Sequence, residues 1–196
     1  MKNMIPCCAA VAVLLFACCL SFSQGNIPAQ PKVIECSTQG TSTQSDKLQS
    51  ITIRINGYST DEERTSLIKA YDEKGSEGLY SALKKMPSKG RVSLSGTTGF
   101  DLKFVRLLPE SSKGILKIRL VTDRPIAAAE HLKASTRTMD YNLAAIEVNL
   151  DSANVQDKST GILLPACEFV IDKTTRELNI KTYQNPWKLF NFFGVK

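Results

Sequence analysis

From Gly90 to the C-terminus, short segments of alternating apolar and polar residues follow one another, with turns between them. They cover about residues 91–95, 100–105, 115–122, 141–150, 161–171, 177–183 and 187–195. Alternation with a period of two places the apolar side chains on one face of a strand. Segments that follow each other closely usually pair antiparallel. Six or seven of these strands are therefore expected in one antiparallel sheet.

One strand and two helices are predicted before this sheet. The strand covers about residues 50–56, where isoleucine recurs at every second position. The first helix begins within residues 59–63, because these hydroxyl and acidic side chains have capping-box spacing. That interpretation is preferred to a metal or acid–base cluster. The helix is expected to end at Gly75, and a second helix to run from Ser76 to Pro87. The predicted fold class is α+β: a strand, a two-helix hairpin and a curved antiparallel sheet of six or seven strands packed on the helices.

The first 23 residues have the order of a secretory signal peptide. Lys2 supplies a positive charge, residues 5–20 are almost wholly apolar, and residues 21–23 place small side chains where a signal peptidase reads them. The apolar run is shorter than the roughly 20 residues that span a bilayer, so we expect no transmembrane helix in the mature chain. The predicted location is secreted or periplasmic. The alternative is a protein lipid-anchored in the bacterial envelope through Cys18, which follows a small residue.

Export also changes what the cysteines can do. Four of the six lie in the signal segment, which leaves Cys36 and Cys167. An oxidising compartment permits a disulfide between them, and this bond is predicted over free thiols or a bond between two chains. Residues 24–47 are predicted to be a flexible leader because they are rich in Gln, Ser, Thr, Gly and Pro. The disulfide would pin this leader to a single domain that spans residues 48–196.

Several classes of partner are disfavoured by composition. The net charge is +6, but Lys and Arg are spread along the chain, which is typical of a solvated surface rather than a nucleic-acid-binding face. One histidine and no close pair of cysteines in the mature chain predict no metal site. Because the sequence also lacks a phosphate-binding glycine pattern and a Gly-x-Ser-x-Gly elbow, we predict no cofactor and no catalytic residues.

Four residues are the candidates for binding: Asp101, Asp123, Arg124 and His131. Asp123 and Arg124 follow a predicted strand, where they would contact an anion or a carbohydrate, or simply form a turn. The aromatic run at residues 187–193 has two interpretations. It is either a surface for a partner or membrane, or a strand packed on the core.

A wider set of residues resembles a group of uncharacterised exported bacterial proteins. Its most specific part is the Thr-Asp-Arg-Pro-Ile segment at residues 122–126, and another is the Ser-Thr-Asp-x-Glu-Arg helix start at residues 59–64. The resemblance covers about residues 50–195. It implies an exported bacterial protein with a compact domain, and it assigns no activity and no catalytic residues.

The sequence therefore predicts a non-enzymatic exported domain that binds a small ligand or a protein partner in the bacterial envelope. The alternative is a hydrolase or lyase of unrecognised type that acts on an envelope or extracellular polymer. Such an enzyme would use the same acidic, basic and histidine candidates named above.

Overall fold

The computed structural model of the chain describes residues 28–40, 48–108, 114–126, 141–171, 178–182 and 185–196. These residues form nine strands and two helices, in the order β1 (Val33–Gln39), β2 (Leu48–Ile55), α1 (Asp61–Lys85), β3 (Gly90–Leu94), β4 (Phe100–Leu107), β5 (Ile115–Thr122), β6 (Leu143–Asp151), α2 (Val155–Lys158), β7 (Thr160–Ile171), β8 (Leu178–Thr182) and β9 (Trp187–Val195).

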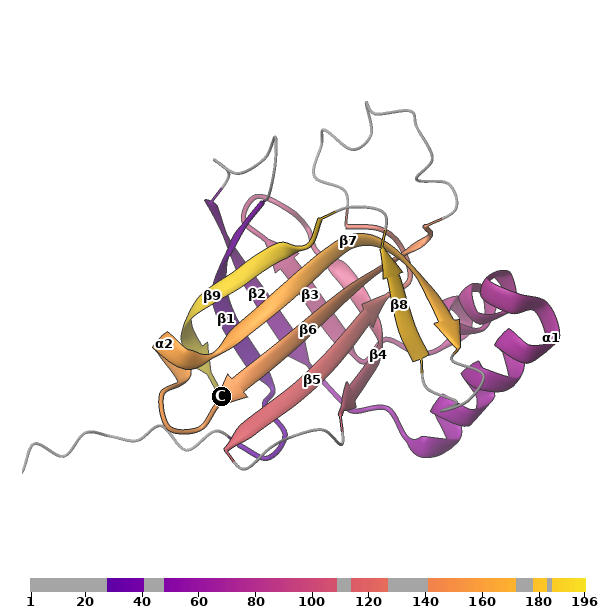
Figure 1. The fold of residues 1–196 in the computed structure, drawn as a ribbon, viewed down its shortest axis with the longest axis horizontal. Coiled ribbons are helices and arrows are strands. Elements are labelled where there is room, and N and C mark those ends of the chain that lie inside the picture. Colours follow the sequence, from indigo (N-terminus) through magenta and orange to yellow (C-terminus); the bar gives the residue numbers. More distant parts are fainter. Residues whose placement is uncertain (1–27, 41–47, 109–113, 127–140, 172–177, 183–184) are drawn as a thin grey trace, which may run out of the picture.

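The strands close into an antiparallel barrel (Figure 1). Eight of them are neighbours in the order β6-β5-β4-β3-β2-β1-β9-β7, and β7 pairs again with β6. Closure gives each of these strands a partner on both sides, so the barrel wall has no free edge. The ninth strand, β8, pairs with the end of β7, from Cys167 to Ile171.

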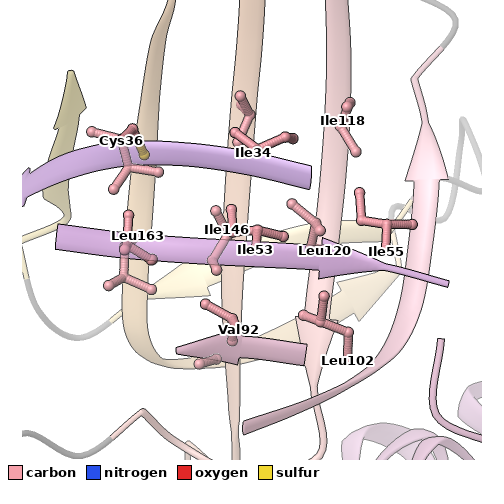
Figure 2. Close-up of a cluster of buried hydrophobic side chains, with 14 of the residues drawn as sticks. Ile34, Cys36, Ile53, Ile55, Val92, Leu102, Ile118, Leu120, Ile146 and Leu163 are labelled. Carbon is pink, nitrogen blue, oxygen red and sulfur yellow. The ribbon is translucent and has the colours of Figure 1, made fainter. Parts of the chain in front are cut away.

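The inside of the barrel is filled by side chains from its own strands. Figure 2 shows Ile34, Ile53, Leu102, Leu120 and Ile146 pointing toward one another from five different strands. Trp187, Leu189 and Phe192 of β9 complete this inner cluster. The alternation seen in the sequence thus places every second side chain of the wall in one shared core.

A second apolar cluster lies outside the barrel, where α1 covers part of the wall. Leu67, Leu79 and Leu83 of α1 are buried against Phe104 and Phe169 of strands β4 and β7. Both faces of the wall are therefore buried at this place. The register of β6 against β7 also shifts between Leu143 and Ala145, which marks a β-bulge in this part of the wall.

Helix α1 begins and bends where the sequence indicates. Thr60 and Glu63 form a reciprocal capping box, with bonds of 3.2 Å from the Glu63 amide to Thr60 Oγ1 and 2.9 Å from the Thr60 amide to Glu63 Oε2. At Lys74 and Gly75 the backbone leaves the helical conformation, and Gly75 has a φ of 62°. The predicted end of one helix and start of another is thus a kink within one long helix.

The predicted fold class is wrong in how the sheet and helices are arranged. The sheet is a closed barrel filled by its own side chains, and the single long helix lies on its outer surface. The physical reason is β1, which pairs with β2 on one side and β9 on the other. The predicted sheet contains no strand at residues 33–39, because these residues are predicted to belong to a flexible leader. Without this strand the predicted sheet cannot close into a barrel. The leader prediction is wrong for these residues, which belong to the barrel wall.

The predicted disulfide between Cys36 and Cys167 is also wrong. Both cysteines are buried free thiols. Cys36 points into the inner cluster, as Figure 2 shows, whereas Cys167 belongs to the cluster outside the barrel. The strands that carry them, β1 and β7, are separated by β9. The wall of the barrel therefore keeps the two sulfur atoms apart.

We expect both thiols to resist modification in the folded protein. Burial raises the pKa of Cys36 and of Cys167 from 9.0 to about 12, so both stay protonated where an exposed cysteine forms thiolate. An aromatic disulfide reagent at pH 8 should react with neither until urea unfolds the chain, and a reductant should leave the melting temperature unchanged. Rapid labelling of the folded protein would contradict this expectation.

The two buried thiols should also make the stability of the protein depend on pH. Above about pH 9 the thiols ionise in the unfolded chain but stay protonated in the folded one, so the free energy of unfolding should fall as the pH rises from 9 toward 12.

Candidate functional site

A groove lies on the outside of the barrel, between the second half of α1 and the end of β7. The pairing of β6 with β7 ends at Leu143 and Cys167, and β7 continues outward with β8 as its partner. The groove has a volume of about 620 Å³. This lies within the roughly 300–1,000 Å³ typical of small-molecule sites. Its lining residues come from α1, β7, β8 and the segment that enters β6: Ser76, Glu77, Tyr80, Ser81, Tyr141, Asn142, Leu143, Cys167, Glu168, Phe169 and Lys181.

The bend in α1 provides one wall of this α1–β7 groove. Ser76 and Tyr80 are four residues apart, as are Glu77 and Ser81, so each pair lies on one side of the helix after the kink. The buried side chains of Leu143, Cys167 and Phe169 contribute apolar surface from the barrel side. The groove thus combines polar groups from the helix with an apolar base.

Glu168 is held in the opposite wall by two side chains. The Ser76 hydroxyl donates a short hydrogen bond to Glu168 Oε1, and Lys181 Nζ lies 3.7 Å from Glu168 Oε2. The Glu168 side chain is 23% exposed, and that of Lys181 is 61% exposed. An ion pair this open contributes little to stability, so its members are available to another charged or polar group.

The groove is suited to binding and not to nucleophilic attack by its thiol. The pKa of Cys167 is raised to about 12 by burial, so the sulfur carries its proton near neutral pH. The lining also offers the rings of Tyr80 and Tyr141, the amide of Asn142 and the hydroxyl of Ser81. Such a mixture of aromatic surface and hydrogen-bonding groups can hold a small polar molecule in one orientation.

Two of the residues predicted from the sequence meet at another place, the turn between β3 and β4. Arg91 lies 3.4 Å from the Asp101 carboxylate and donates a 2.8 Å hydrogen bond to the Thr98 carbonyl. Arg124 donates a 3.3 Å hydrogen bond to the Gly99 carbonyl, and its guanidinium lies 5.0 Å from the centre of the Phe100 ring. Asp101 and Arg124 therefore both hold the turn, and their polar groups are largely used there.

Asp123 does not join them. Asp123 lies 4.0 Å from Lys103 Nζ, which donates a 3.0 Å hydrogen bond to the Met86 carbonyl at the end of α1. His131 lies outside the described residues. None of Asp101, Asp123 and Arg124 lines the α1–β7 groove. The described candidates from the sequence therefore lie outside the groove, which the sequence analysis did not predict.

The aromatic run near the C-terminus follows the core interpretation for three of its side chains. Trp187, Leu189 and Phe192 point into the barrel, and β9 pairs with both β1 and β7. Phe190 and Phe193 are exposed on the outer surface. The run is therefore a wall strand with two aromatic side chains left outside.

Within the described part of the chain, no helix is long and apolar enough to cross a membrane. The same residues contain no group of three His, Cys, Asp or Glu side chains close enough to hold a metal ion. Comparison of the chain with protein-family models, with curated proteins and with solved structures finds no match.

Proposed function

We propose that this chain is an exported bacterial protein that binds a small polar ligand in the α1–β7 groove without changing it chemically. The observation that carries the proposal is the groove itself. It has the volume of a ligand site, and polar groups from four separate segments converge on it. The barrel acts as the rigid support, because its interior is occupied by the inner cluster.

Export is part of the proposal and rests on the signal-like order of the first 23 residues. The first described strand, β1, begins at Val33, so cleavage after Ser23 would leave every described strand of the barrel in the mature protein. The alternative of a lipid anchor at Cys18 would leave them there too. The resemblance to exported bacterial proteins supports the same compartment.

Binding is favoured over hydrolysis or lyase chemistry by the placement of the acidic residues. Asp101 and Asp123 each lie beside a basic side chain outside the groove. Inside the groove, the Glu168 carboxylate is held by Ser76 and Lys181, and the described lining contains no histidine. The two carboxylates that line the groove belong to Glu77 and Glu168, and Glu168 is already bound by Ser76 and Lys181, so we prefer binding to hydrolysis of a polymer.

A variant that fills the groove tests the proposal. Ser81→Trp should abolish ligand binding, because an indole side chain would occupy the space that the ligand needs. Ser50→Trp is the matched control, since Ser50 is an exposed serine on β2, away from the groove. The measurement is protein-observed NMR with panels of sugars, amino acids, polyamines and carboxylic acids. We expect at least one panel to shift the signals of residues 76–81, 141–143 and 167–169 in the wild type and in Ser50→Trp only. If no panel does so, or if Ser81→Trp binds equally well, the groove is not the site.

A further inference from the structure

We propose that the α1–β7 groove selects small organic cations, meaning ligands that carry an ammonium group. This inference rests on the proposed function and names the class of ligand. The first observation is the charge of the lining, where Glu77 and Glu168 stand against one cation, Lys181. The groove is thus locally acidic on a chain whose net charge is +6. A negative recess on a basic protein attracts cations and repels anions at close range.

The aromatic side chains support the same class of ligand. Tyr80 and Tyr141 both line the groove. A ring face next to carboxylates is the environment in which proteins hold ammonium groups, because the negative face of the ring attracts the cation. Tyr80 already shows this behaviour, since Lys84 Nζ lies 5.8 Å from the centre of its ring.

Lys181 occupies the position in which a ligand ammonium group would bind Glu168. Its ammonium group lies 3.7 Å from Glu168 Oε2, a distance at which attraction persists without a close hydrogen bond. The lysine is largely exposed, so a ligand ammonium can displace it at low cost. Glu168 Oε1 stays fixed by the Ser76 hydroxyl, which keeps the carboxylate in the wall while Oε2 changes partner.

The test uses the mature protein and calorimetric titration with putrescine and choline, beside glucose and acetate as neutral and anionic probes. Glu168→Gln should weaken cation binding about tenfold, because it removes a charged acceptor but keeps an oxygen for Ser76. Glu77→Gln should also weaken it. Lys181→Met should strengthen it about threefold, because a competing cation is lost. Glu73→Gln is the matched control, since Glu73 lies on the same helix outside the groove and pairs with Lys69.

The direction in which Lys181→Met changes cation binding is the sharpest test of the inference. It remains informative even if Glu168→Gln does not fold. The inference is overturned if neither cation binds, if the three glutamate variants behave alike, or if Lys181→Met weakens cation binding. If glucose or acetate binds in the groove instead, the groove is a binding site but not for cations, and the proposed function stands. If the groove-filling variant Ser81→Trp binds every probe as the wild type does, the proposed function fails as well.

Discussion

Replacing Leu120 with alanine is expected to lower the free energy of unfolding by about 4 kcal/mol. The Leu120 side chain is 0% exposed and lies in the inner cluster. It faces Val105 of β4 and Ile146 of β6 in the strand register. Each of these strands has hydrogen-bonded partners on both sides, so the wall cannot move inward to fill the cavity that the substitution leaves. Urea denaturation followed by circular dichroism measures the change.

Leu48→Ala is the matched control, because it removes the same atoms from a residue that is 66% exposed. Its effect should stay within about 0.5 kcal/mol. A loss at Leu120 as small as that at Leu48 would mean that the inside of the barrel is not packed as described. The comparison therefore tests the feature that distinguishes this fold from a sheet curved around helices.

A filled barrel also explains why the candidate site lies outside it. The inner cluster occupies the space that barrels of this kind otherwise offer to a ligand. The groove forms instead where β7 stops pairing with β6 and turns outward with β8. Because α1 lies against this part of the wall, the end of β7 and the bent helix become the two sides of a recess.

Strands with aliphatic inward residues could be predicted from the sequence, and β1 could not. In β2 the inward positions are Ile51, Ile53 and Ile55, which is a clear period of two. In β1 the inward positions are Ile34, Cys36 and Thr38, all fully buried, so only one of the three is aliphatic. The residues around β1 have the polar composition of a flexible leader, although buried and exposed side chains alternate along the strand itself. The closing strand of the barrel was therefore the one with the weakest apolar signal.

The groove could not be predicted because its parts are far apart along the chain. Ser76 and Glu168 are 92 positions apart, and they meet only after α1 has packed on the wall. The Asp123-Arg124 segment is a candidate in the sequence because a carboxylate and a guanidinium are adjacent at the end of a predicted strand. In the structure these neighbours contact different partners, Lys103 and the Gly99 carbonyl. Adjacency along the chain was thus a poor guide to which side chains share a site.

Gly90→Ala is expected to destabilise the protein by about 3 kcal/mol, through backbone strain and a steric clash together. Gly90 is the first residue of β3 and pairs with both Ile55 of β2 and Leu102 of β4. Its φ is 154°, which side-chain-bearing residues rarely adopt, and a Cβ there would lie 2.1 Å from the Arg54 carbonyl oxygen. That oxygen belongs to the backbone of the neighbouring strand, so relieving the contact must shift the wall itself.

Two other glycines separate the two causes. Gly96 has a φ of 80° but no atom within 4 Å of an added Cβ, so Gly96→Ala should cost only the strain, about 1 kcal/mol. Gly57 has neither a positive φ nor a close neighbour, so Gly57→Ala should leave stability unchanged within about 0.5 kcal/mol. Urea denaturation of the three variants should give the order Gly90, Gly96, Gly57. If Gly90→Ala costs no more than Gly96→Ala, then β3 does not approach β2 as closely as the barrel requires. A cost near 3 kcal/mol at Gly90 alone would show that the wall is tight where β3 begins.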